Sequence, residues 1–468
     1  MTSENQVFLA LLRSDLPSFV RKVFQTVSPN DQYLDNWHIH AMCEMLRRIA
    51  TGEVKRLIIT IPPRQMKSIT VTIAFVAWLM GRNPKLRVIC ASYSQDLASH
   101  HSMQTRTVMS SVWYQNVFPK LQLSEDKNTQ SEYWTTEQGY RIATSLGGAL
   151  TGKGADILII DDILKAEDGQ SLVKRLLALG WYMSTAVTRL NDPKNGIIII
   201  VQQRLHEDDL PGHLLSKGGW THLNLPAIAE IKETIPIGSG QFHTRAPGDV
   251  LHEARMSKTE LDQIQHDIGS YNFASQFQQR PAPAGGGIVK KEWLQYYEVP
   301  FVPDPNDEIV QSVDVATSAS QAGNYSVILT VACRDGKLYL IDVFRKKMEF
   351  PALRKLIPLH ANKFKAGIVI VEATGVGLSL FQELQQRDPH RYYCTKPKDS
   401  KEDRLMKVAH LVENGLVYLP ESAPWLQDFL QELESFPNGK YDDQVDAFSQ
   451  SLKWLYRWIK LSQAEQYI

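Results

Sequence analysis

The stretch LIITIPPRQMKS, residues 57–68, decides the fold of the first half of the chain. Residues 57–61 form an apolar, β-branched run that predicts a buried strand. A tight loop follows and ends in Lys67 and Ser68, and an apolar helical pattern begins at Ile69. Strand, loop, Lys-Ser and helix are the parts of a P-loop, whose backbone amides and helix N-terminus hold phosphates. We therefore predict a nucleotide site in which the lysine neutralises phosphate charge and the serine reaches Mg²⁺.

Two positions depart from the general P-loop pattern GxxxxGK[ST]. Ile61 and Met66 stand where that pattern has glycine. A Lys-Ser pair at the start of an ordinary helix would give the same letters, so the loop alone leaves both interpretations open.

A second stretch, DILIIDD at residues 156–162, is an apolar strand that ends in two acids. Such acids are costly inside a sheet unless they meet a cation or solvent at its edge. In a P-loop ATPase, Asp161 would hold Mg²⁺ through water and Asp162 would orient the attacking water. The alternative is a strand that leaves the core into an acidic turn.

Short apolar strands alternate with helical stretches up to about residue 225. The strand runs span residues 57–61, 86–91, 157–160 and 197–201. This alternation predicts an α/β fold with a mostly parallel sheet and flanking helices. The stretch QRPAPAGGGIVKK, residues 279–291, holds two prolines and three glycines and reads as a linker. We predict a P-loop ATPase domain over 1–280, a linker over 281–300 and another domain over 301–468.

The pattern changes beyond the linker. Three predicted strands follow in quick succession over residues 309–315, 326–333 and 338–344. The Asp-Gly pair in RDGK, residues 334–337, is typical of a tight hairpin. A helix over 351–364, a strand over 368–371 and further helices and short strands complete the chain. A three-strand meander followed by alternating helices and strands predicts an RNase H-like α/β fold.

Five acids lie at the ends of these predicted elements: Asp314, Glu372, Asp442, Asp443 and Asp446. Singly, each has a structural explanation, since acids suit helix N-termini, edge strands and glycine-rich turns. Together they would repel one another unless they surround divalent metal. Two Mg²⁺ or Mn²⁺ ions, roughly 3.5–4 Å apart, would then activate water and stabilise the leaving oxygen of a phosphodiester. The predicted core ligands are Asp314, Glu372 and Asp443, with Asp442 and Asp446 as flanking candidates.

The overall composition sets few limits. The chain has 468 residues, enough for two domains, and its 51 basic and 51 acidic residues cancel. Any DNA contact must therefore come from local patches, among which we favour the segment 396–404 with Lys396, Lys398, Lys401 and Arg404. A solvated surface is the other explanation for these charges. The four cysteines lack metal-ligand spacing, no apolar run reaches the ~20 residues of a membrane span, and the N-terminus lacks the pattern of a signal peptide.

These motifs resemble those of the large terminase subunits of tailed bacteriophages. The resemblance covers most of residues 33–455. It rests on the loop PPRQMKS (62–68), GEVKRLII (52–59), ASYS (91–94), QQRLHEDD (202–209) and LPA (225–227), besides both acidic sets. The resemblance implies ATP-driven translocation of viral double-stranded DNA into the procapsid and metal-dependent endonucleolytic cutting of the DNA concatemer. A cellular helicase-nuclease of repair or defence is the alternative, but strand-separating helicase motifs are missing after residue 162. A nonenzymatic scaffold with decayed motifs would also account for Ile61 and Met66.

The resemblance also implies roles for single residues. ATP would contact Pro62, Pro63, Arg64, Gln65, Met66, Lys67, Ser68 and Asp161, with Mg²⁺ at Ser68 and Asp161. Arg64 would stabilise γ-phosphate charge, or it could simply pair with Asp161 and Asp162. Gln203 or Arg204 would couple hydrolysis to movement, although glutamines at a strand end also satisfy backbone groups. Arg141 and Arg189 stay open as arginines that act on a neighbouring subunit.

The implied partners are double-stranded DNA, the small terminase subunit, the portal protein and further copies of the chain in a ring, as a pentamer, with no membrane. The implied location is the cytoplasm of the infected or lysogenic bacterial host, outside the mature virion.

Overall fold

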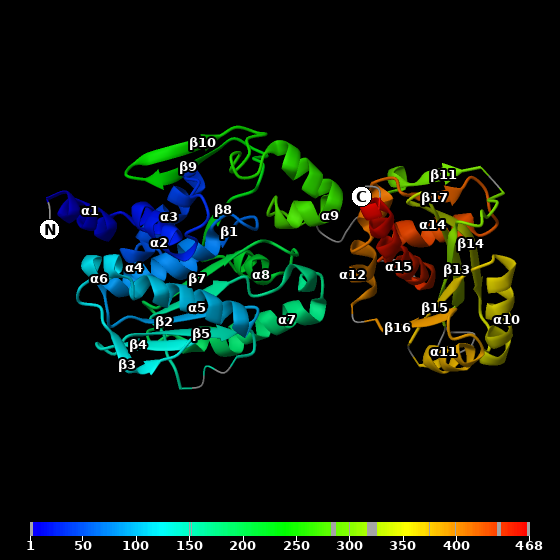
Figure 1. Ribbon diagram of the computed structural model, residues 1–468, viewed down its shortest axis with the longest axis horizontal. Helices are drawn as coiled ribbons and strands as arrows, with labels where there is room; N and C mark the ends of the chain where they lie inside the picture. The colour runs from blue at the N-terminus through cyan, green and yellow to red at the C-terminus, as the bar shows by residue number, and fades with distance from the viewer. Residues whose placement is uncertain are drawn as a thin grey trace. The chain divides into compact units, whose positions relative to one another are not determined.

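The computed structural model describes residues 3–148, 150, 152–281, 287–298, 300–315, 325–373, 375–397, 399–437 and 441–465. The chain divides into two compact units (Figure 1). Unit 1 comprises Met1–Gln265 and Tyr271–Ala282, and unit 2 comprises His266–Ser270 and Pro283–Ile468. Among the described residues, no helix is long and apolar enough to cross a membrane.

Unit 1 is built on an eight-stranded sheet of order β3-β4-β5-β2-β6-β7-β1-β8. The strands are β1 (Arg56–Thr60), β2 (Arg87–Ser92), β3 (Leu123–Asn128), β4 (Glu132–Thr135), β5 (Tyr140–Ser145), β6 (Ile157–Asp161), β7 (Ile197–Gln202) and β8 (Thr221–Asn224). All neighbours from β5 to β8 pair in parallel, and the antiparallel pairs are β3–β4 and β4–β5, so β4 alone runs opposite to the other strands. The predicted mostly parallel sheet is confirmed.

Alternate side chains of the central strands enter two separate cores, as the two-residue period of a strand requires. Leu57 and Ile59 join the core beneath the helices that precede and follow β1, and Ile58 joins the opposite core. The first face carries α1 (Ser3–Ser14), α2 (Leu16–Val27), α3 (Trp37–Ala50), η1 (Ile69–Ala74), α4 (Phe75–Arg82), α5 (Gln95–Met109) and α6 (Val112–Val117). The second carries α7 (Leu172–Trp181), η3 (Tyr182–Ala186) and α8 (Leu210–Lys217). A hairpin, β9 (Glu233–Gly238) and β10 (Gln241–Arg245), and α9 (Lys258–Gln276) complete the unit.

Unit 2 holds a seven-stranded sheet of order β11-β17-β14-β13-β12-β15-β16. Its strands are β11 (Gln295–Tyr297), β12 (Glu308–Asp314), β13 (Ser326–Arg334), β14 (Lys337–Lys346), β15 (Ile368–Glu372), β16 (Tyr392–Thr395) and β17 (Val417–Pro420). The antiparallel meander β12-β13-β14 has a tight turn at Asp335 and Gly336, with φ of 48° and 73°, as a two-residue hairpin requires. Strands β15 and β16 continue in parallel from β12, which gives the predicted RNase H-like arrangement.

The helices of unit 2 cover both faces of this sheet. One face carries α10 (Phe350–Lys363) and α11 (Val376–Arg387). The other carries α12 (Lys401–Met406), α13 (Ala409–Glu413), α14 (Leu426–Ser435) and α15 (Asp443–Glu465). Strand β11 lies inside the predicted linker 281–300, yet it pairs with β17, so the folded part of unit 2 begins earlier than residue 301. Residues 282–286 and 299 of that linker lie outside the described residues.

Candidate active sites

The P-loop of unit 1 keeps its shape without the usual glycines. Met66 has a φ of 63°, in the left-handed region, at the position where the general pattern has glycine. Its side chain packs against the core below, which helps to hold a conformation that costs an L-residue about 1–2 kcal/mol. Arg64 has the same φ. The Ile61 N–H donates to the Gln202 carbonyl at 3.2 Å, so the start of the loop is fixed to β7.

The lysine of the loop meets the acids that end β6. Lys67 Nζ lies 2.7 Å from Asp162 Oδ2, and both residues sit at the C-terminal ends of parallel strands. Asp161 is completely buried and accepts a hydrogen bond of 2.6 Å from the Thr72 hydroxyl. Burial raises the pKa of both acids, and the Lys67 charge opposes that rise. A hydrogen bond with the Ser68 side chain also lowers the pKa of Asp161, so the two residues predicted to hold Mg²⁺ face each other.

Arg64 does not pair with Asp161 or Asp162, which was the structural alternative that the sequence left open. It is exposed and makes no hydrogen bond or ion pair with the described residues, whereas Lys67 occupies Asp162. Gln65 is buried, and its Oε1 lacks a hydrogen-bond partner within the described part of the chain. Pro62 is buried and Pro63 half-buried in the same loop.

Arg141 is a buried cation that the sequence pattern did not reveal. It lies on β5, fully buried, and none of its three guanidinium nitrogens makes a hydrogen bond with the described residues. Its charge opposes the burial-driven rise in the pKa of Asp161. Burial and then Arg141 lower the pKa of His101 to about 4, so this imidazole, 3.7 Å from Asp161, is neutral at pH 7. Complete burial excludes Arg141 as an arginine donated to a neighbouring subunit.

Three consecutive residues at and just after the end of β7 connect the nucleotide site with the end of unit 1. Gln202 accepts from the P-loop, as described above. The Gln203 backbone N–H stabilises the Asp162 carboxylate, and the Arg204 N–H donates to Gln279 Oε1 at 2.9 Å. Gln279 is the first residue of the Pro/Gly-rich stretch 279–291, so the end of β7 joins the nucleotide loop to the segment that leaves unit 1.

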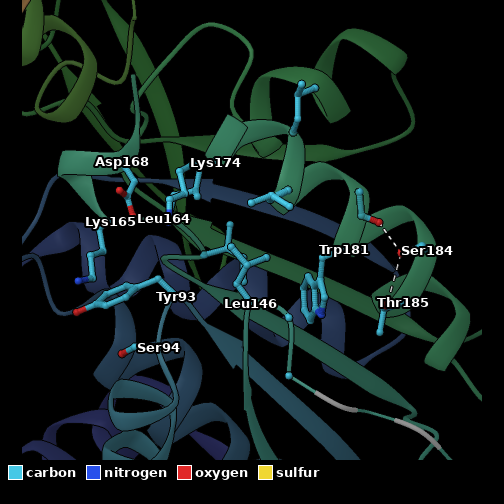
Figure 2. A pocket seen from close by; sticks show the side chains of 16 residues that line it. Tyr93, Ser94, Leu146, Leu164, Lys165, Asp168, Lys174, Trp181, Ser184 and Thr185 are labelled. Atoms are coloured by element: carbon cyan, nitrogen blue, oxygen red, sulfur yellow. Dashed lines mark hydrogen bonds between the residues drawn. The ribbon is translucent and has the colours of Figure 1, made fainter. Parts of the chain in front are cut away.

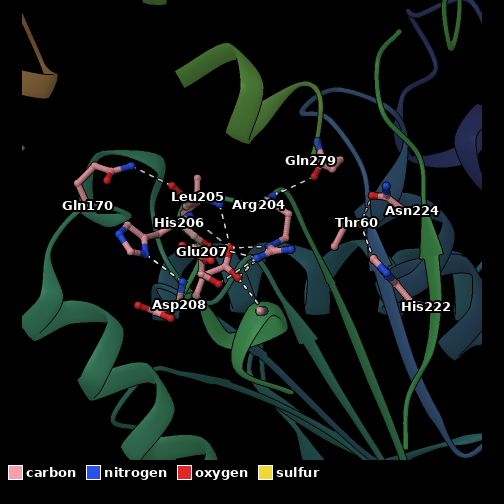
Figure 3. A network of polar contacts seen from close by, with 12 residues as sticks. Thr60, Gln170, Arg204, Leu205, His206, Glu207, Asp208, His222, Asn224 and Gln279 are labelled. Atoms are coloured by element: carbon pink, nitrogen blue, oxygen red, sulfur yellow. Dashed lines mark hydrogen bonds and ion pairs between the residues drawn. The ribbon is translucent and has the colours of Figure 1, made fainter. Parts of the chain in front are cut away.

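The Arg204 side chain has a structural role. Its Nε lies 2.9 Å from Asp209 Oδ1, and Asp209 is fully buried (Figure 3). Asp209 also accepts the Leu205 N–H at 2.9 Å and caps α8 through the Gly212 N–H. The guanidinium is therefore engaged in holding its own loop, while the side-chain Oε1 of Gln203 lacks a hydrogen-bond partner among the described residues.

In unit 2 the structure brings acids from three elements together. Asp314 ends β12, Glu372 ends the neighbouring parallel strand β15, and Asp446 lies in the first turns of α15, which packs on β12. Burial, followed by the charges of Asp446 and Glu372, raises the pKa of Asp314 to about 8. Asp446 is almost completely buried, and burial raises its pKa to about 6.

Two basic residues of α12 hold these acids. Arg404 Nη1 lies 2.6 Å from Glu372 Oε2, and Arg404 Nη2 lies 2.8 Å from Asp446 Oδ1. Lys401 Nζ contacts Asp446 at 2.5 Å and Asp442 at 2.8 Å. Asp443 is also buried, its charge helps to raise the pKa of Asp314, and it accepts the Tyr325 N–H at 3.4 Å. Arg404 joins Asp446 to Glu372, while Asp443 has no ion pair with Arg404 or Lys401 among the described residues.

The acids of unit 2 have the chemistry of ligands for divalent metal. Carboxylates that raise one another's pKa are chemically suited to Mg²⁺ or Mn²⁺, which prefer oxygen ligands. Within the described ranges, however, no group of three or more His, Cys, Asp or Glu side chains is arranged to hold a metal ion. Lys401 and Arg404 occupy the oxygens instead. The residues fit the metal by chemistry and topology, and binding requires these two cations to change partners.

The sequence of unit 2 matches a known family. Residues 311–453 match the family model of the terminase RNaseH-like domain. The large terminase of a thermophilic bacteriophage has a similar fold over 88% of this chain and 98% of its own, with a TM-score of 0.54 and 13% identity. Residues 311–453 thus carry the terminase RNaseH-like domain, and the chain as a whole has the fold of that large terminase. A crystal of the same phage protein in complex with ATP-γ-S aligns over 86% of this chain and 96% of its own, with a TM-score of 0.50 and 14% identity. No curated protein matches the sequence.

We predicted that the segment 396–404 is a loop that faces DNA. Two of its basic residues face the acids of unit 2 instead. Lys401 and Arg404 point to the acids because α12 packs against α15, and Arg404 is buried. Lys407, just beyond, pairs with Asp399 at 2.8 Å. Lys396 is exposed, and Lys398 lies outside the described residues.

A pocket of about 760 Å³ opens in unit 1 (Figure 2). Figure 2 shows Tyr93 and Ser94 after β2, Lys165 after β6, and Trp181 at the end of α7 around it. Lys165 Nζ lies 5.5 Å from the centre of the Tyr93 ring. None of residues 62–68 lines this pocket, so it is separate from the P-loop.

Proposed function

We propose that this chain is a phage large terminase subunit that hydrolyses ATP to translocate double-stranded DNA and cuts the DNA concatemer with a divalent-metal-dependent nuclease. The observation that carries the proposal is the presence of two acidic sites in one chain of terminase fold. One joins Lys67 to Asp161 and Asp162, and the other joins Asp314, Glu372 and Asp446 within a terminase RNaseH-like domain.

In the proposed motor, the backbone amides of residues 62–68 bind the phosphates and Lys67 leaves Asp162 for the β- and γ-phosphates. Ser68 and Asp161 then hold Mg²⁺, and the freed Asp162 orients the attacking water. Arg64, exposed and unpaired among the described residues, extends from the loop and stabilises γ-phosphate charge. The similar large terminase of a thermophilic phage forms a complex with ATP-γ-S, which supports nucleotide binding by this chain.

In the proposed nuclease, Asp314, Glu372 and Asp446 would hold Mg²⁺ or Mn²⁺, with Asp443 at the start of α15 and Asp442 just before it as further candidates. Bound metal supplies an activated water and charge stabilisation for the leaving oxygen. Lys401 and Arg404 keep the acids paired and move toward phosphate when the acids take metal. Exposed bases nearby hold the DNA backbone.

The partners and location follow from the family resemblance. We propose a homo-oligomeric ring, a pentamer, that binds the portal protein and the small terminase subunit in the cytoplasm of the bacterial host. Both activities would then act on the same DNA molecule.

Two substitutions in the full-length chain test the proposal. Lys67→Ala is expected to abolish ATP hydrolysis and leave metal-dependent DNA cutting intact. Asp314→Asn is expected to abolish cutting and leave hydrolysis intact, with Lys355→Ala on exposed α10 as the matched control for both. Cutting that persists without divalent metal, or hydrolysis that survives Lys67→Ala, contradicts the corresponding half. ATP-driven strand separation in place of packaging would favour the helicase-nuclease.

A further inference from the structure

A second pocket of unit 2 lies next to the nuclease acids. It has a volume of about 370 Å³ and lies between the end of β16, α12 and the middle of α15. Thr395 of its wall is the register partner of Glu372 across the β15–β16 pair. Arg404 belongs both to this wall and to the ion pairs with Glu372 and Asp446, so one side chain separates the pocket from the acids.

The α15 side of the pocket continues the helix face of Asp446. Gln450, Lys453, Trp454 and Arg457 follow Asp446 by four, seven, eight and eleven residues, which places all of them near one face of the helix.

The pocket is rich in positive charge that the protein does not neutralise. Lys396, Lys453 and Arg457 are exposed and make no ion pair or hydrogen bond with the described residues. The acid of the wall, Asp399, is already paired with Lys407 at 2.8 Å. An anion is therefore the ligand that this wall favours, and phosphate is the anion that a nuclease substrate brings.

The pocket also offers an aromatic platform. The Trp454 indole is half-buried, with the Tyr393 ring centre 5.2 Å and the Arg457 guanidinium 5.9 Å from the centre of the indole. Aromatic faces flanked by basic side chains are typical of sites that stack the bases of unpaired strands. A volume of about 370 Å³ falls in the range of small-molecule pockets, whereas a base pair inside a duplex cannot enter one.

We propose that this pocket receives one unpaired nucleotide of the DNA strand beside the bond that is cut. Its base stacks on Trp454, and its phosphates bind Lys396, Lys453 and Arg457. The proposal rests on the proposed nuclease function and adds a subsite that favours locally unpaired DNA. Enzymes that act on extruded nucleotides favour mismatched or unpaired positions because less base stacking has to be broken there.

The test compares variants of the full-length chain on a 20-mer of single-stranded oligothymidine and on a duplex with one unpaired thymine. Trp454→Ala is expected to weaken oligothymidine binding by about 5- to 150-fold, the usual range for one lost stacking contact. It should also abolish the preference for cutting near the unpaired thymine. Trp454→Phe should retain both properties, which separates a stacking role from a folding defect. Lys453→Gln should make the negative slope of log affinity against log salt concentration less steep by about 0.7.

Lys337→Gln is the matched control, because Lys337 of β14 also lies close to an aromatic ring, 5.3 Å from that of Tyr418 on β17, in the part of the sheet remote from β16. It should change neither binding nor cutting. Salt-dependent effects of Lys453→Gln without any effect of Trp454→Ala would show that only backbone phosphate binds, which overturns the nucleotide subsite. Normal binding and cutting by a folded Trp454→Ala protein, while Asp314→Asn abolishes cutting, overturns the subsite and leaves the nuclease standing. Absence of metal-dependent cutting by the unmodified chain overturns the nuclease itself.

Discussion

Replacement of Arg204 by methionine tests whether this residue holds its loop or acts on the nucleotide. Arg204 is 9% exposed and Asp209 is 0% exposed, so the substitution leaves a carboxylate buried without its cation. Loss of one partner from a buried ion pair costs about 3–5 kcal/mol. The Leu205 and Gly212 N–H groups, each 2.9 Å from Asp209, still stabilise the charge and place the expected cost near 3 kcal/mol.

Hydrogen exchange on the full-length chain measures this cost locally. A loss of about 3 kcal/mol should speed exchange of the backbone amides of residues 205–212 by about 150-fold, while α10 of unit 2 stays unchanged. Asp209→Ala should have a larger effect, by about 1 kcal/mol, because it also removes the N-cap of α8. If Arg204→Met leaves exchange of this loop unchanged and still abolishes ATP hydrolysis, the structural assignment is refuted and a role at the nucleotide is supported.

Three further predictions concern the loop and the acids. Met66 has a positive φ, which glycine adopts without the strain that alanine would keep. This strain of about 1 kcal/mol should make hydrogen exchange across η1 about fivefold slower in Met66→Gly than in Met66→Ala. Asp446→Asn should reduce DNA cutting by more than about 100-fold, because it removes a proposed metal ligand. Asp442→Asn should reduce cutting by about 10- to 100-fold, the usual range for a residue that only supports a metal ligand. EDTA should abolish cutting, and excess Mn²⁺ or Mg²⁺ should restore it; unchanged cutting in EDTA would contradict the metal assignment.

The sequence predicts the most apolar strands of both sheets, β1, β2, β6 and β7 in unit 1 and β12 to β15 in unit 2, because their signal is local, whereas it gives no ranges for the remaining strands. Runs such as ILIID and IIIIVQ are apolar on both faces, as strands β6 and β7 of a doubly covered sheet must be. The positions of Asp161, Asp314 and Glu372 at strand ends follow from the same runs, since parallel neighbours bring their C-terminal ends to one edge. The start of unit 2 does not follow, because β11 is fixed only by pairing with β17, far along the chain.

The ion pairs that shape the two sites are beyond local patterns. Arg404 reads as part of a basic surface segment, yet it binds Glu372, 32 residues away in sequence. That contact depends on how α12 packs against α15, and no spacing rule encodes it. The left-handed Met66 is equally hidden, since glycine is the usual sign of such a backbone.

Both sites solve the same electrostatic problem in the same way. Buried carboxylates need a nearby cation. Lys67 forms an ion pair with Asp162, Lys401 with Asp446, and Arg404 with Glu372. A phosphate-bearing ligand with Mg²⁺ can take over each pairing at once, because its anion attracts the basic side chain while its metal compensates the charge of the acids at that site. Neither half of this exchange is favourable alone, since each would leave one charge buried and unpaired. Metal and phosphate should therefore bind cooperatively at both proposed sites, and binding of either one without the other should be weak.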